Sequence, residues 1–296
     1  MDQLISVVVI GLSVGGMYAL LALGLAMVFA VIGLVNFAHG EMIAVTGYSM
    51  FFLLMTGIPF SVVAIFAVFM AIIAAVLMER IAFRPVRNAT LAAGLITSFA
   101  LEMILETGWS NFISPLRRPI KIPPWVMHYW QIGDTGINTY QIIAILMTII
   151  SVVTLTIFLK RTILGLAMRA AAEDFPVVQL MGIRANRVIA TAFAISGMLA
   201  GFAGLLWIAQ RSSVDPHIGL NPTIKAFIAV VFGGVGSLSG AVAGGLILGI
   251  MEVCLRSFLP ESAMPFREAI GYSVVILVLL KWPDGLISMK FGRKKD

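Results

Sequence analysis

A short polar segment interrupts a long apolar region near the start of the chain. Its sequence, Asn36-Phe-Ala-His-Gly-Glu41, places an amide, an imidazole (His39) and a carboxylate within six residues, next to Gly40. A buried polar group costs several kcal/mol unless it has a partner. These side chains could therefore line a route for a polar solute, and a secondary transporter could use Glu41 to bind an ion.

A second interruption lies in the C-terminal half and consists of glycine and serine. It divides the apolar stretch Ile224–Phe258, whose 35 residues are too few for two full spans of about 20 residues each. We therefore predict two short or partial helices that meet within the membrane. The residues predicted to line a path at this break are Gly233, Gly234, Gly236 and Ser237. The alternative is that Gly233, Gly236, Gly240 and Gly244 only allow helices to pack closely.

Two further carboxylates lie among apolar residues. Glu102 and Glu106 are four residues apart and share one helical face. They could bind a coupling ion or a proton, or they could lie near the outer end of a span, wetted or paired with a basic residue such as Arg117. Glu252 and Arg256 have the spacing of an ion pair along one helix.

Motifs for covalent chemistry are absent from the sequence. There is no G-x-x-x-x-G-K-[ST] motif for ATP phosphates, no H-E-x-x-H and no G-x-S-x-G. Cys254 is the single cysteine, and the three histidines are widely separated. We therefore expect a chain that is not an enzyme and that holds no metal or cofactor of its own.

The composition identifies the environment of the chain. Hydrophobic residues make up 60% of its 296 residues and charged residues 11%, against about 45–50% and about 25% in ordinary soluble domains. Apolar runs of 18 residues or more favour helices over the short alternating strands of a membrane barrel. The sequence therefore predicts an all-α, polytopic transmembrane bundle in lipid, forming one domain over residues 1–296.

About eight spans are expected, some of them broken or short. They run approximately over Leu4–Leu34, Met42–Thr56, Phe60–Met78, Ala89–Trp109, Tyr140–Leu159, Val188–Ala209, Ile224–Phe258 and Ala269–Leu280. Whether the first of them crosses once or bends into two short helices stays open. The longest connection, Ser110–Thr139, is rich in proline and aromatic residues, and we expect an ordered cap on the outer membrane face.

Basic residues predict the orientation. The net charge of +6 is concentrated at the ends of apolar segments, which indicates retention on the cytoplasmic side rather than a nucleic-acid partner. Three groups are placed in the cytoplasm: Arg80, Arg84 and Arg87; the five cations between Lys160 and Arg187; and Lys290, Arg293, Lys294 and Lys295 in the tail.

The cytoplasmic connection 160–187 has an amphipathic pattern. Alanines after Arg169 favour a helix, Glu173 and Asp174 suit the first turn of a following helix, and Gly182 suits its end. Val177, Leu180 and Met181 form an apolar ridge that needs a partner surface, which could also be the protein's own helix ends.

These segments together resemble one known family. The run from Arg169 to Gly182 is similar to the loop by which ABC importer permeases dock onto their ATPases. Asn36–Glu41 with Thr46-Gly47-Tyr48, and Gly233–Ala241, resemble signature stretches of the branched-chain amino acid ABC transporter permease family. The similarity covers nearly the whole chain in order and spacing.

The resemblance implies a permease of the bacterial inner membrane that moves amino acids by alternating access. It implies a paralogous permease as partner, two ATPase subunits that bind the ATP, and a periplasmic solute-binding protein. Related permeases carry urea, short amides or aromatic acids, so the solute stays open. The alternative from a different class is a secondary transporter driven by ions through Glu41, Glu102 or Glu106.

Overall fold

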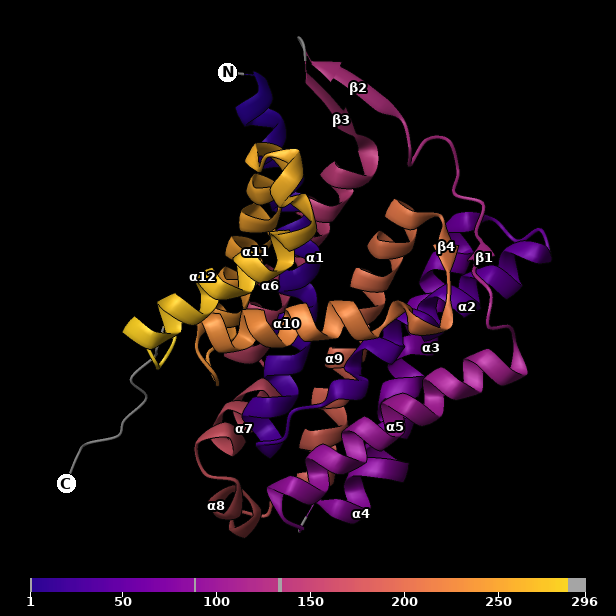
Figure 1. Cartoon of the computed structure of the whole chain (residues 1–296). Helices are drawn as coiled ribbons and strands as arrows, with labels where there is room; N and C mark the ends of the chain where they lie inside the picture. The colour runs from indigo at the N-terminus through magenta and orange to yellow at the C-terminus, as the bar shows by residue number, and fades with distance from the viewer. Residues whose placement is uncertain (1, 88, 133–134, 287–296) are drawn as a thin grey trace.

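The computed structural model describes residues 2–87, 89–132 and 135–286, which form a helical bundle (Figure 1). Eight helical segments within these residues are long and apolar enough to cross a membrane. This confirms the predicted all-α membrane architecture. The main helices are α1 (Asp2–Ile32), α2 (Glu41–Met55), α3 (Phe60–Met78), α5 (Leu91–Phe112), α6 (Thr139–Arg161), α9 (Ala185–Arg211), α11 (Leu238–Phe258) and α12 (Arg267–Lys281).

Shorter elements connect these helices. They are the 3-10 turn η1 (Phe37–Gly40), the π-helical turn η2 (Glu79–Phe83), α4 (Arg84–Val86), α7 (Ile163–Glu173), α8 (Phe175–Leu180), η3 (Pro216–Ile218), α10 (Leu220–Gly233) and η4 (Glu261–Phe266).

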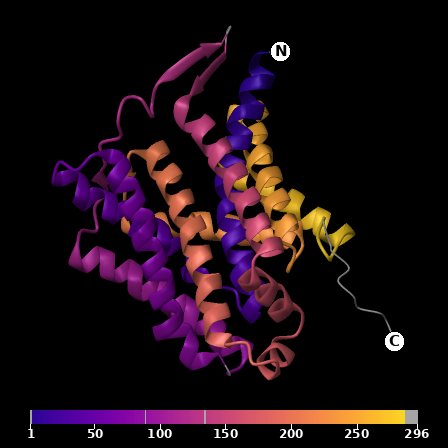
Figure 2. The same ribbon diagram turned by 180° about the vertical axis from the view of Figure 1, so that it is seen from behind.

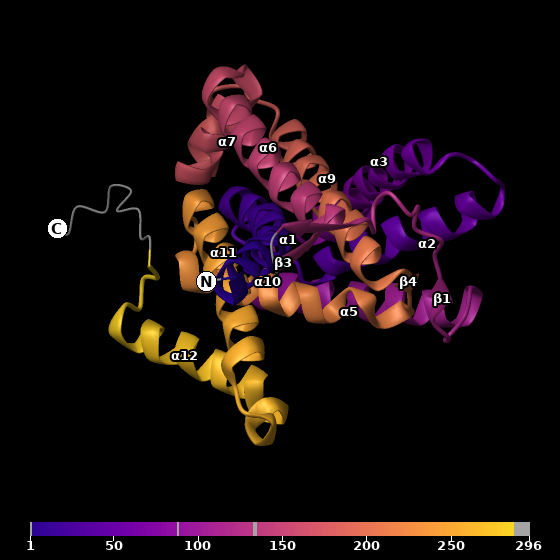
Figure 3. The ribbon, with the colours of Figure 1, turned by 90° about the horizontal axis from the view of Figure 1, so that it is seen from above.

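Helix α1 forms the centre of the bundle. It is one continuous helix, which answers the question that the sequence left open, and it is apolar all round because it is surrounded by α6, α9, α10 and α11 (Figure 3). Its closest neighbour is α11, where an added Cβ at Gly245 or Gly249 would overlap the backbone of α1. By contrast, α3, α5, α6 and α12 leave most of their apolar surface uncovered, as helices that face lipid or a partner do.

The two ends of the bundle differ in what they carry. Figures 1 and 2 show the start of α1 and the hairpin of β2 (Tyr129–Ile132) and β3 (Thr135–Asn138) at one end, and α4, α7 and α8 at the other. Two of the three basic groups predicted to be cytoplasmic therefore share one end. The third, at Lys290, Arg293, Lys294 and Lys295, lies outside the described residues.

Helix α10 lies across the bundle instead of along it (Figure 1). It has 14 residues and ends at Gly233, so the first of the two predicted partial helices is short as expected. The second prediction is wrong, because α11 has 21 residues and is a candidate span of full length. The chain can reverse here because Gly234 and Gly236 adopt positive φ angles. After α12 the chain returns to this point, and the Leu286 amide donates to the Phe232 carbonyl at 2.9 Å.

The predicted cap between α5 and α6 contains short strands, which were not predicted from the sequence. β1 (Arg118–Pro119) pairs antiparallel with β4 (Ser213–Val214), which follows α9, and β2 pairs with β3. Trp125, Tyr129 and Trp130 expose about half of their surface. The β1–β4 pair therefore fastens the cap to the end of α9. The aromatic side chains of the cap are left outward, where amphipathic rings suit a membrane interface.

The close crossing of α10 and α11 provides a test of packing. A Cβ at Gly244 would overlap the Ala229 carbonyl, whereas a Cβ at Gly108 would meet nothing within 4 Å. We expect Gly244→Ala to destabilise the protein by about 1–3 kcal/mol. Gly108→Ala should be neutral or stabilising by up to about 1 kcal/mol, since alanine is the better helix former. Unfolding in detergent measures both, and equal effects would show that the crossing is not close.

Candidate functional site

The polar break Asn36–Glu41 lies deep inside the bundle. Helix α1 stops at Gly33, whose φ of 74° suits a helix C-terminus, and the chain then forms η1 before α2 begins at Glu41. Gly40 allows this turn to contact the start of α10, because a Cβ there would overlap Thr223 and the Gly219 carbonyl. The break is therefore fixed by backbone-to-backbone contact with α10.

The side chains of this break are buried and only partly satisfied. Asn36 donates to the Met78 sulfur at 3.4 Å, and Nδ1 of His39 lies 3.2 Å from the Ser196 hydroxyl. The remaining polar atoms, Oδ1 of Asn36 and Nε2 of His39, have no hydrogen-bond partner within the described protein. Unpaired buried polar atoms are unusual and call for a ligand, water or a moving partner.

Glu41 is oriented by a tryptophan from α5. Its side chain is 0% exposed, and its Oε2 accepts a hydrogen bond from the Trp109 indole nitrogen at 2.7 Å. Its other oxygen, Oε1, has no partner among the described residues. The sequence did not identify Trp109, because the two residues are 68 positions apart and no local spacing relates them.

The carboxylates of α5 lie on the face that carries Trp109. Glu106 pairs with Nδ1 of His217, on η3, at 2.6 Å, while Arg117 pairs with Asp215 at 3.5 Å. The proposed Glu106–Arg117 pairing is therefore wrong, although a basic residue near the outer end does pair with Glu106. Glu102 is buried, and its Oε1 has no partner in the described chain.

Three phenylalanines adjoin this polar region and were not predicted. Phe37 of η1 stacks on Phe99 of α5, with ring centroids 4.2 Å apart, and lies 5.5 Å from the ring of Phe227 on α10. Phe99 keeps 45% of its surface exposed. This aromatic trio, Phe37, Phe99 and Phe227, provides an apolar surface beside the carboxylates.

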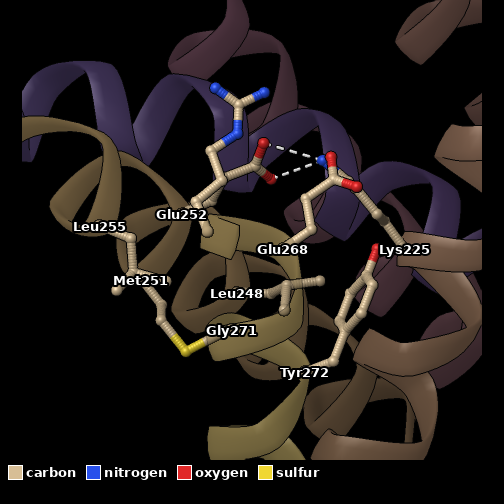
Figure 4. Close-up of a pocket in the computed structure, with 9 residues that line it drawn as sticks. Lys225, Leu248, Met251, Glu252, Leu255, Glu268, Gly271 and Tyr272 are labelled. Atoms are coloured by element: carbon tan, nitrogen blue, oxygen red, sulfur yellow. Dashed lines mark hydrogen bonds and ion pairs between the residues drawn. The ribbon is translucent and has the colours of Figure 1, made fainter. Parts of the chain in front are cut away.

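A second charged cluster joins α1, α10 and α11. Lys225 Nζ lies 2.8 Å from both carboxylate oxygens of Glu252 (Figure 4). The Tyr18 hydroxyl of α1 donates to the same carboxylate at 2.8 Å. Glu268 and Tyr272 of α12 point toward this pair across a small pocket (Figure 4). The expected pairing of Glu252 with Arg256 is wrong, because the carboxylate forms its ion pair with Lys225 of α10 instead.

The two predicted breaks do not adjoin. The first contacts the start of α10 and the second lies at its end, so a helix of about 20 Å separates them at 1.5 Å per residue. At the second break, Gly234 and Ser237 are buried and Gly236 is exposed. Gly233 contacts Gly240 so closely that a Cβ would overlap its carbonyl. Close packing therefore accounts for Gly233, Gly240 and Gly244, as the alternative interpretation held, but not for Gly236.

The predicted coupling segment forms two successive helices, α7 and α8, as its residue pattern indicated. Asp174 leaves the helical conformation and caps α8 by accepting a hydrogen bond from the Val177 amide at 3.1 Å. Gly182 ends this helix with a φ of 80°. Arg169 and Glu173 of α7 are exposed, and Leu180 is 88% exposed at the end of the bundle that carries α4. All three residues of the ridge, Val177, Leu180 and Met181, are exposed, whereas the neighbouring Val178 is buried.

Comparison with known proteins gives a consistent result. A family model described as the branched-chain amino acid transport system permease component matches residues 7–280. The high-affinity branched-chain amino acid transport system permease protein LivH of Salmonella typhimurium (strain LT2) is 35% identical over 293 residues, which cover 94% of this chain and 93% of LivH. BraD of Pseudomonas aeruginosa (strain PAO1), with the same description, is 34% identical over 291 residues, or 94% of this chain and 93% of BraD.

A more distant relative is a second kind of permease. LivM of Salmonella typhimurium is 28% identical over 198 residues, which cover 65% of this chain and 42% of LivM. No solved structure matches the chain significantly. These similarities favour a transport permease over the ion-coupled alternative. The resemblance predicted from the motifs is thus confirmed: the chain is a multi-pass membrane protein that belongs to the branched-chain amino acid transport permease family.

Proposed function

We propose that this chain is the permease subunit of an ATP-driven importer that moves branched-chain amino acids across the bacterial inner membrane. The observation that carries the proposal is the match to LivH and BraD over 94% of the chain. Its substrate is proposed from the printed descriptions of those relatives. The chain itself performs no covalent chemistry and binds no cofactor, because separate ATPases bind the ATP.

The proposed partners correspond to distinct surfaces. A paralogous permease similar to LivM covers the apolar surface left open by α5 and α12. Two ATPases dock at the end that carries α7 and α8, where Val177, Leu180 and Met181 are exposed. A periplasmic solute-binding protein approaches the opposite end, beside the β2–β3 hairpin.

The mechanism we propose is alternating access. ATP binding closes the ATPase pair, and α7 and α8 transmit that motion to α6 and α9, which flank them in the chain. Reversing a two-state equilibrium from 1:99 to 99:1 requires about 5.5 kcal/mol. A short helix that is capped by Asp174 can couple a free-energy difference of this size to the membrane helices, while a flexible loop cannot. The polar break Asn36–Glu41 and the glycine break Gly233–Ser237 then open toward the other face.

Reconstitution tests this function directly. The chain, its paralogue, both ATPases and the binding protein are placed in liposomes, and uptake of L-leucine is measured. We expect accumulation that requires ATP and every partner. Accumulation driven by an ion gradient in vesicles that hold this chain alone would overturn the proposal.

Variants of the polar break separate transport from assembly. We expect Glu41→Ala or Asn36→Leu to reduce leucine uptake at least tenfold. Each variant removes a buried polar group that is proposed to line the translocation route. Co-purification of the ATPases should be unchanged, since the break is buried and contributes no residue to α7 or α8. Normal uptake kinetics in both variants would remove this break from the translocation route.

A further inference from the structure

Carboxylates form a lane from the outer end of α5 into the polar break. His217, at its mouth, has a side chain that is 68% exposed, and its partner Glu106 is 23% exposed. Further in, Glu102 is 5% exposed and Glu41 is 0% exposed. We call Glu106, Glu102 and Glu41 the acidic lane. Its accessible end can collect a cation from water, and its buried end can hold one.

The inner half of the acidic lane has carboxyl oxygens without a partner in the described part of the chain. Trp109, which donates to Glu41, lies on the face of α5 that carries Glu102 and Glu106. Oε1 of Glu41 and Oε1 of Glu102 both lack a partner among the described residues. Buried carboxylates are costly unless a positive group pairs with them. The arrangement therefore suits an occupant that carries a positive charge and several hydrogen-bond donors.

An independent observation comes from a tyrosine on the same face of α2. Tyr48 lies two turns beyond Glu41, its residue is 2% exposed, and its hydroxyl has no partner within the described chain. Its ring stacks on Trp109 at 5.0 Å, and Trp109 is the donor that holds Glu41. Aromatic faces beside carboxylates attract ammonium groups, because the ring quadrupole adds to the attraction of the carboxylate.

The surface next to the inner carboxylates is apolar. Phe37 lies one helical turn before Glu41, and Phe99 lies one turn before Glu102, so the aromatic trio adjoins both carboxylates. Phe227 of α10 completes it. A small molecule with an ammonium group beside a branched hydrocarbon chain would match both surfaces.

Building on the proposed function, we propose that Glu41 and Glu102 bind the α-ammonium group of an amino-acid substrate, and that the aromatic trio contacts its branched side chain. Trp109 positions one oxygen of Glu41 and leaves the other free for the ammonium group. Glu106 and His217 form the entrance. Through this site, the permease would itself select the substrate, in addition to any selection by the binding protein.

Equilibrium binding tests the site. The purified complex of both permeases and both ATPases, without binding protein, is titrated with radiolabelled L-leucine up to millimolar concentration. Isopentylamine, which has the ammonium group and branched chain but no carboxylate, should compete, whereas 4-methylpentanoate, which lacks the ammonium group, should not. Competition by the acid but not the amine, or no leucine binding at all, would overturn the assignment.

Variants assign the binding to these residues. Glu41→Gln and Glu102→Gln should each weaken leucine binding at least tenfold, since a hydrogen-bonded charge is lost, and Phe99→Ala should weaken leucine more than alanine. The matched control is Glu261→Gln, on the exposed turn η4, which should bind leucine normally. Normal binding by both glutamine variants would refute the site while leaving ATP-driven uptake intact. Failure of the unaltered complex to import leucine would refute the proposed function instead.

Discussion

Leu180→Glu should abolish association with the ATPase subunits while the bundle still inserts and folds. The side chain is 88% exposed, so its replacement removes no packing within this chain, and the free energy of unfolding should change by no more than about 0.5 kcal/mol. In the assembled importer the same side chain would lie in an apolar contact, where an unpaired carboxylate costs several kcal/mol. Affinity purification of the complex, followed by quantitation of the ATPases, measures the loss.

A control for this variant lies on the same helix. Gln179→Glu adds the same charge at an exposed position beside the ridge of Val177, Leu180 and Met181. It should retain the ATPases. Gly182→Asp is a less specific test, because the φ of 80° at Gly182 would strain any other residue and could unwind the end of α8. If the ATPases co-purify with Leu180→Glu at the normal yield, α8 is not the docking helix.

Lys225→Met and Glu252→Gln should each destabilise the protein by about 2 kcal/mol, because removal of one partner leaves the other charge partly buried and unpaired. The double variant should lose no more than about 1 kcal/mol, since the glutamine that replaces Glu252 would still accept the Tyr18 hydrogen bond and no isolated charge would remain. Unfolding in detergent gives the three values. Their difference from additivity is the energy of the pair.

The control for this cycle uses the neighbouring Glu268. It faces the same pocket from α12 but is exposed (Figure 4), and Glu268→Gln should change stability by no more than about 0.5 kcal/mol. Additive losses in the Lys225 and Glu252 variants would mean that the two side chains do not form a pair in the membrane. The pair matters because it holds the crosswise helix α10 against α1 and α11.

The spans could be predicted from the sequence because each depends on one local quantity, the length of an apolar run. The same reasoning misjudged Ile224–Phe258, where counting 35 residues predicted two helices that are both short or partial. The structure divides them unevenly, since α10 lies across the bundle and needs no full span. Backbone turns were predictable where glycine determined them, as at Gly182 and Gly236.

The site was only half predictable. Asn36, His39 and Glu41 could be found because polar residues stand out in an apolar run. Their partners could not, because Trp109 and Ser196 belong to other helices and no periodicity relates them. For the same reason the sequence predicted Arg256 as the partner of Glu252. Helical spacing identifies neighbours along one helix, and it cannot identify Lys225, which lies on α10.

The return of the chain to α10 has a practical consequence. The hydrogen bond from Leu286 to Phe232, with Gly285 packed against Gly234, ties the residues that follow α12 to the end of the crosswise helix. A purification tag or fluorescent fusion should therefore begin beyond Leu286. A reporter joined at Trp282 would remove the Leu286 amide and leave the Phe232 carbonyl without this hydrogen bond, and it would thereby perturb the end of α10.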